Sequence, residues 1–223
     1  MINHRPAIVL TLALLVAATA VFAADEDGGL WASAAVAKRF NDDFSADVTV
    51  QLRFDDDIGR LERTLLRPSV SYHLAPRQSV TLGYDAHFID APGDFVEQRL
   101  WQQYEVSQEF APVVASLRIR LEERFFDHVD GVPVRVRVKA GVDVPVANSP
   151  WRLTLANEAF IGLNDTARSQ PDGFHENRAF IGFGRSLSAQ LNGQIGYQNQ
   201  FLDGRARDRM IHQLFIGVAL KLP

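Results

Sequence analysis

Residues 132–146 read VPVRVRVKAGVDVPV. Valine stands at almost every second position, and Arg135, Arg137, Lys139 and Asp143 stand between the valines. A period of two predicts an extended strand with one apolar and one charged face. A soluble sheet would bury the valines in a core, whereas a membrane barrel would turn them out to lipid. The rest of the chain has to decide between these two arrangements.

The first 23 residues have the layout of a secretory signal peptide. His4 and Arg5 form a short basic start, and an apolar run leads to the small-residue pattern that ends at Ala23. This pattern predicts cleavage after Ala23 and export of the mature chain, residues 24–223, as a single domain. The alternative is an uncleaved membrane anchor, but the run is short for a bilayer span and acidic residues follow it.

Composition excludes several classes of protein. The chain of 223 residues carries 23 basic and 27 acidic residues, a net charge of -4, so no nucleic-acid-binding surface is expected. It has no cysteine, which rules out disulfides and thiolate metal sites, and no cofactor is predicted. Beyond the signal peptide no apolar run approaches the roughly 20 residues of a membrane helix. A membrane-spanning mature chain would therefore have to cross as strands.

Period-two alternation recurs along the whole mature chain and indicates about eleven strands. The alternating segments are 31–40, 44–54, 66–74, 79–88, 97–107, 116–126, 132–146, 151–161, 176–184, 190–201 and 213–222. Short turns at 41–43, 74–78, 111–112, 147–150 and 187–188 alternate with longer polar loops at 55–63, 90–94, 127–131, 164–173 and 203–208. Alternating short and long connections are typical of an up-and-down barrel in the outer membrane.

Three features favour a membrane barrel over a soluble one. The alternating cores run about 9 to 11 residues, which crosses a bilayer at barrel tilt. The polar face mixes Arg and Glu on neighbouring strands, and aromatic residues such as Phe44, Tyr72, Phe88 and Phe110 lie near strand ends. The competing fold is a secreted lipocalin-like barrel. The sequence therefore predicts an all-β, transmembrane, up-and-down antiparallel barrel with a charged lumen and an apolar lipid-facing exterior. Because such barrels have even strand numbers, we expect ten or twelve strands.

Several stretches resemble the bacterial outer-membrane family called domain of unknown function 2490 (DUF 2490). They are FDDDIGRLERTLLRPSVSYHL, LGYDAHF, EQRLWQQYEV, LRIRLEERF, HENRAFIGFG and GYQNQF, which together cover nearly the whole mature chain. The resemblance implies an outer-membrane β-barrel without an assigned activity, so it transfers no catalytic residues. One departure from outer-membrane barrels in general is the end of the last strand, which reads Leu220-Lys221-Leu222-Pro223 rather than closing on an aromatic residue.

The polar face supplies the main candidate site, a network of arginines and glutamates in the lumen. Its predicted members are Arg53, Glu97, Arg99, Glu105, Arg118, Arg120, Glu122, Arg124, Arg135, Arg137, Lys139, Glu158, Glu176 and Arg178. One interpretation is a structural ion-pair network that fills a narrow barrel, since buried charges must be paired. The other is a basic lining that guides or binds an anion.

Enzymatic and metal-binding alternatives rest on weaker groupings. His87 and Asp85 share the inward face of one strand, opposite Ser69, Ser71 and His73, but such residues fill a lumen more often than they catalyse. No Gly-x-Ser-x-Gly or His-Glu-x-x-His motif occurs. Acidic loop residues could bind divalent cations that bridge lipopolysaccharide, although they are more often turn formers; they are Asp55, Asp56, Asp57, Asp127, Asp130, Asp203 and Asp208.

The sequence therefore predicts an outer-membrane barrel that is structural or acts as a narrow, anion-preferring conduit or binding barrel. The alternatives are a lipid-modifying outer-membrane enzyme and a soluble periplasmic lipid-binding barrel. The expected partners are outer-membrane lipids, lipopolysaccharide and the machinery that inserts barrels. Substrate and oligomeric state stay open.

Overall fold

The computed structural model describes residues 25–90, 95–127, 131–166, 172–204 and 207–223. The predicted signal peptide, residues 1–23, lies outside this part of the chain. All regular structure in the described residues is β-strand, and no helix there is long and apolar enough to cross a membrane.

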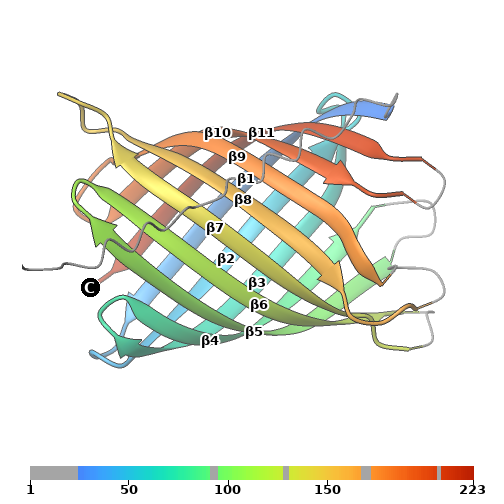
Figure 1. The fold of residues 1–223 in the computed structure, drawn as a ribbon, viewed down its shortest axis with the longest axis horizontal. Helices are drawn as coiled ribbons and strands as arrows, with labels where there is room; N and C mark the ends of the chain where they lie inside the picture. The colour runs from blue at the N-terminus through green and yellow to red at the C-terminus, as the bar shows by residue number, and fades with distance from the viewer. Residues whose placement is uncertain (1–24, 91–94, 128–130, 167–171, 205–206) are drawn as a thin grey trace, which may run out of the picture.

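Eleven strands in the described residues form one closed barrel, in which each strand pairs with its neighbours in sequence (Figure 1). The strands are β1 (Asp25–Arg39), β2 (Phe44–Asp55), β3 (Arg60–Ala75), β4 (Gln78–Ile89), β5 (Phe95–Phe110), β6 (Val113–Phe126), β7 (Val134–Pro145), β8 (Arg152–Gly162), β9 (Gly173–Ser186), β10 (Leu191–Leu202) and β11 (Arg209–Leu222). The alternation in the sequence thus located every strand, including the weak segment 31–40.

The expected even strand number is wrong for this structure, because the sheet closes by a parallel pairing. β1 pairs with β11 in parallel, from Asp25 opposite Arg209 to Lys38 opposite Leu222, while all other pairs are antiparallel. The expectation of ten or twelve strands assumed that both chain ends leave the barrel at the same side. A parallel ladder also pairs the backbone of both edge strands, so closure does not require an even number.

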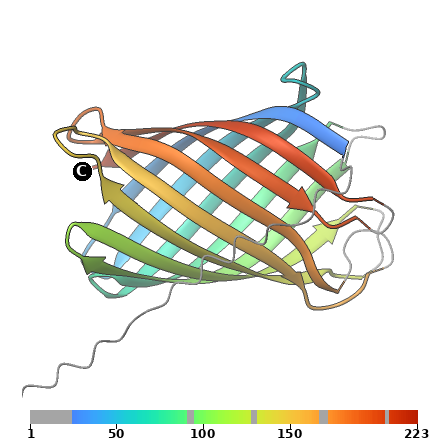
Figure 2. The same cartoon turned by 45° about the horizontal axis from the view of Figure 1, so that its top comes forward.

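The connections between strands differ at the two ends of the barrel (Figure 2). At one end, where β11 finishes, are the tight connections 76–77 and 111–112; the other end, where β1 begins, carries 127–133 and 163–172. We call these the turn end and the loop end. The loop expected at 55–63 is shorter than predicted, because β3 already begins at Arg60 and only 56–59 connect it to β2.

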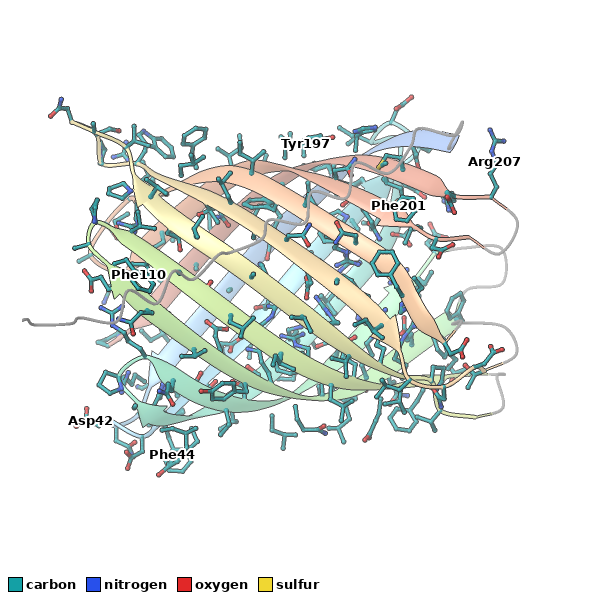
Figure 3. The ribbon with its side chains drawn as sticks, viewed as in Figure 1. Asp42, Phe44, Phe110, Tyr197, Phe201 and Arg207 are labelled. Carbon is teal, nitrogen blue, oxygen red and sulfur yellow. The ribbon has the colours of Figure 1, made fainter. Side chains whose placement is uncertain are left out.

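The apolar side chains lie on the outside of the barrel. Among the described residues, 34 large hydrophobic side chains are exposed, whereas only six hydrophobic residues are buried against seventeen polar or charged ones. Figure 3 shows Phe44 and Tyr197 pointing away from the barrel wall. In β7 the buried residues are Arg135 and Arg137, at 4% and 6% exposure, so the arginines between the valines face the interior. This inverts the arrangement of a soluble protein.

Candidate functional site

Glu122 is the centre of a buried ion-pair cluster in the barrel interior. Its side chain is fully buried, and its two carboxylate oxygens lie 2.7 Å from Arg135 and 2.6 Å from Arg137. Arg120 lies 3.6 Å and Arg99 3.9 Å from the same carboxylate. The pairing follows from the sheet register, since Glu122 of β6 stands directly opposite Arg135 of β7.

Two more glutamates extend this cluster on either side. Glu97 of β5 accepts hydrogen bonds from Arg99 at 2.7 Å and from Arg124 at 2.5 Å. Glu158 of β8 accepts from Arg137 at 2.8 Å and from Arg118 at 2.6 Å. Because Arg99 and Arg137 both also approach Glu122, the three acids and their arginines form one continuous network across β5 to β8.

A second buried group is built around Asp85 of β4. Arg67 Nε and Nη2 each donate to this carboxylate at 2.7 Å, and Trp101 Nε1 donates at 2.6 Å. The Trp101 ring covers Gly83, where an added Cβ would lie 2.0 Å from ring atom Cζ2. Arg120 stacks on the same ring, 3.8 Å from its centroid. These contacts join side chains of β3, β4, β5 and β6 in the barrel interior.

The predicted network residues do not all join these clusters. Arg178 pairs separately with Glu176, at 2.5 Å. Glu105 is exposed and accepts only a hydrogen bond of 3.3 Å from Gln103 among the described residues. Within the same part of the chain, neither Lys139 nor Arg53 has a carboxylate within 4.0 Å.

Sequence reasoning missed several residues of the interior. Arg67 already stood on the polar face of its alternating segment, so its pairing with Asp85 could have been anticipated. Arg63 lies 3.9 Å from Glu97. It falls within the predicted loop 55–63, and only the observed start of β3 at Arg60 places it on a strand. Trp101 and Phe160 stand two residues after Arg99 and Glu158, so the alternation already places them on the inward face. Trp31 begins a weakly alternating segment and carried no such signal.

The serines and histidines of the enzyme hypothesis are not brought together into a Ser-His-acid site. His87 is fully buried and 3.5 Å from Asp85, whose carboxylate is already bound by Arg67 and Trp101. Ser69 donates to Asp47, and Ser71 bonds with Thr81. His73 instead contacts the hydroxyl of Ser45 at 2.9 Å.

A cavity of about 400 Å³ opens into the barrel interior at the loop end, and we call it the vestibule. Among the residues that line it are seven arginines, five carboxylates and His175. They are Arg53, Arg63, Arg99, Arg124, Arg135, Arg178, Arg209, Asp27, Asp55, Glu62, Glu176 and Asp203. With His175 neutral, this lining carries two positive charges in excess.

The described residues contain no group of His, Asp and Glu arranged to hold a metal ion. Among the acidic loop residues, Asp55 forms an ion pair with Arg60, with 2.6 Å between Oδ2 and Nη2. Asp56 and Asp57 adopt positive backbone φ in the turn between β2 and β3, a conformation in which aspartate is enriched. Asp130 lies outside the described residues, so the expectation of a cation site there is not addressed by the structure.

Comparison with known protein families gives a match. The family described as "Protein of unknown function (DUF2490)" matches residues 28–211, which span β1 to the start of β11. The chain belongs to this family. The predicted resemblance is thereby confirmed, although the family description names neither a location nor an activity. No curated protein and no solved structure matches the chain.

Proposed function

We propose that this DUF2490 protein is a transmembrane barrel of the bacterial outer membrane whose interior is closed and binds anions. The observation that carries the proposal is the inverted distribution of side chains. Ile119, Val70 and Leu82 are 43%, 53% and 56% exposed in the middle of their strands, whereas Glu122 and Asp85 are fully buried. An exterior of this kind is unfavourable in water and favourable in hydrocarbon.

The dimensions and the aromatic residues support the membrane environment. Strands of 11 to 16 residues, tilted as in other barrels, give an apolar wall on the order of 25–35 Å high. Exposed aromatic residues occur at both ends of this wall, with Phe44 and Phe110 at the turn end and Phe88 and Phe174 at the loop end. Two such girdles are typical of outer-membrane barrels.

In this topology the turn end faces the periplasm and the loop end faces outward, as the short and long connections indicate. The apolar wall would contact outer-membrane lipids, and the loop end would meet lipopolysaccharide. The signal-peptide pattern of residues 1–23 supports export, and a barrel of this kind requires the insertion machinery of the envelope.

The contacts inside the barrel favour binding over open conduction. The Glu122 network and the Asp85 group join residues of β3 to β8 by direct hydrogen bonds across the interior. Trp31, Trp101 and Phe160 add buried aromatic bulk. Porins by contrast enclose a water-filled channel. The excess of arginine in the vestibule favours an anion as the bound species.

Gel mobility and fractionation test the membrane proposal. A folded membrane barrel purified without boiling should migrate differently from the boiled chain, and it should stay in carbonate-washed outer membrane. A chain that is released by carbonate, with mobility independent of heating, would instead support a soluble barrel.

Planar-bilayer recordings test the closed interior. We expect at most small currents, reduced further when Arg135 or Arg137 is replaced by glutamine, because a residual pathway for anions would pass these side chains. Large currents that are insensitive to both substitutions would contradict a closed, anion-preferring interior.

A further inference from the structure

The vestibule contains a buried arginine that lacks the acidic partner its neighbours have. Arg53 is only 8% exposed, and its one hydrogen bond to the described residues runs from Nε to Gln51 Oε1, at 2.8 Å. A guanidinium has five N–H donors, and the Nη groups of Arg53 bind no acceptor among the described residues and stay accessible from the cavity that this side chain lines. By contrast Arg178 and Arg135, which line the same cavity, pair with Glu176 and Glu122 at 2.5 Å and 2.7 Å.

The surroundings of Arg53 are unfavourable for its positive charge. Arg53 stands directly opposite Arg63 in the pairing of β2 with β3, and like charges in that position destabilise a sheet. Arg63, also on the cavity wall, has a buried Nε with no hydrogen-bond partner among the described residues. Several donors around one cavity thus lack an acceptor.

Trp31 holds the arginines in place. The Arg53 guanidinium lies 3.9 Å from the centroid of the Trp31 ring, and the Arg178 guanidinium lies 4.9 Å from it. Stacking of this kind restrains the planar groups before any ligand arrives, which lowers the entropy cost of binding. Arginine in a fixed orientation binds carboxylate and phosphate groups through parallel hydrogen bonds.

We propose that the vestibule is a binding site for a water-soluble small molecule bearing a carboxylate or phosphate group, which Arg53 binds above Trp31. The inference rests on the proposed function, and it specifies the chemical class of the anion and the residue that receives it. The volume of about 400 Å³ suits a small molecule. Most of the lining residues are polar or charged, which favours a ligand that enters from solution at the loop end over the acyl chain of a lipid.

Tryptophan fluorescence of the full mature chain, folded in detergent, provides the test. The chain has three tryptophans, and Trp31 is the one that contacts Arg53. Inorganic phosphate and citrate are titrated separately, at constant ionic strength set with sodium chloride. We expect saturable quenching by at least one of them, and the stronger of the two identifies the preferred oxyanion. We also expect that anion to raise the unfolding temperature of the wild-type barrel.

Two variants assign the response to the site. Arg53→Gln should weaken binding about 10- to 100-fold, because a charge-assisted hydrogen bond is lost. Trp31→Phe should remove the fluorescence response and reduce the rise in unfolding temperature that the anion causes, because phenylalanine stacks less strongly on a guanidinium. Arg77→Gln is the matched control, since Arg77 lies at the turn end and pairs with Glu109 away from the vestibule.

The outcomes separate this inference from the proposed function. A folded, heat-modifiable and poorly conducting barrel that responds to neither anion overturns the anion site alone, as does binding that is unchanged in Arg53→Gln. A chain without heat-modifiable mobility overturns the membrane proposal and the inference with it.

Discussion

Glu122 of β6 and Arg137 of β7 form a buried ion pair, with 2.6 Å between Oε1 and Nη1. Glu122 is fully buried and Arg137 is 6% exposed, in a protein whose apolar side chains lie on the outside. Arg137 also donates to Glu158 at 2.8 Å, so the pair connects three strands. The network that takes the place of a hydrophobic core therefore depends on a few shared carboxylates.

Removing the charge of Glu122 should be strongly destabilising. Glu122→Gln leaves Arg135 and Arg137 facing each other without their shared counter-ion, and breaking a buried pair in this way costs about 3–5 kcal/mol. Urea unfolding in detergent, followed by gel mobility, measures the change. As a control, Glu109→Gln removes the exposed ion pair with Arg77 and should cost less than about 1 kcal/mol. Equal effects of the two substitutions would show that the network does not stabilise the barrel.

The membrane proposal predicts that the cost of an exterior arginine depends on its depth. Ile119 and Leu222 are almost equally exposed, at 43% and 42%, but Ile119 lies in the middle of β6 and Leu222 at the end of β11. Ile119→Arg should destabilise the barrel in phosphatidylcholine vesicles by about 2–4 kcal/mol, and Leu222→Arg by no more than about 1 kcal/mol. Equilibrium unfolding from vesicles measures both. A negligible effect at Ile119 would indicate that this wall faces water.

The contact between Trp101 and Gly83 predicts a steric effect in the interior. Gly83→Ala places a Cβ 2.0 Å from Trp101 Cζ2, so the ring must leave its position and its hydrogen bond to Asp85. We expect a loss of about 1–3 kcal/mol, as for other overpacked sites, and a changed near-ultraviolet circular dichroism spectrum. Gly184→Ala is the control, because its nearest neighbour would lie 3.6 Å away. An unchanged spectrum in Gly83→Ala would place the Trp101 ring elsewhere.

The parallel closure of the barrel can be tested by a disulfide. Ser33 of β1 is opposite Gly217 of β11, and a Cβ at position 217 would lie 3.9 Å from the Ser33 Cβ, which is the usual spacing across a disulfide. The end of the Phe215 ring, which would lie 2.9 Å from this Cβ, has to turn aside. Ser33→Cys/Gly217→Cys should therefore cross-link on oxidation, with no native cysteine to compete. The control pair Ser33→Cys/Ala219→Cys should cross-link poorly, because position 219 is two residues beyond the partner of Ser33 on β11. The reverse preference would refute the eleven-strand closure.

Much of the fold could be predicted from alternation alone, because a period of two is a property of each strand by itself. Residues 132–146 show this, since Arg135 and Arg137 lie on the face opposite the valines, as their positions required. The same rule places Arg67 on the interior face. It fails at 55–63, where a register shift between Arg53 and Phe54 interrupts the pairing and β3 begins earlier than the polar composition suggests.

The sequence by itself determined the strands, their two faces and membership of the family, because these depend on local periodicity and on residue type. Only the tertiary structure decided that eleven strands close in parallel, since closure is set by the pairing of β1 with β11, segments at opposite ends of the chain. It also decided which charges are matched. Glu122 meets several arginines while Arg53 meets no carboxylate among the described residues, and this difference arises from register and side-chain reach across the interior, which no single strand contains.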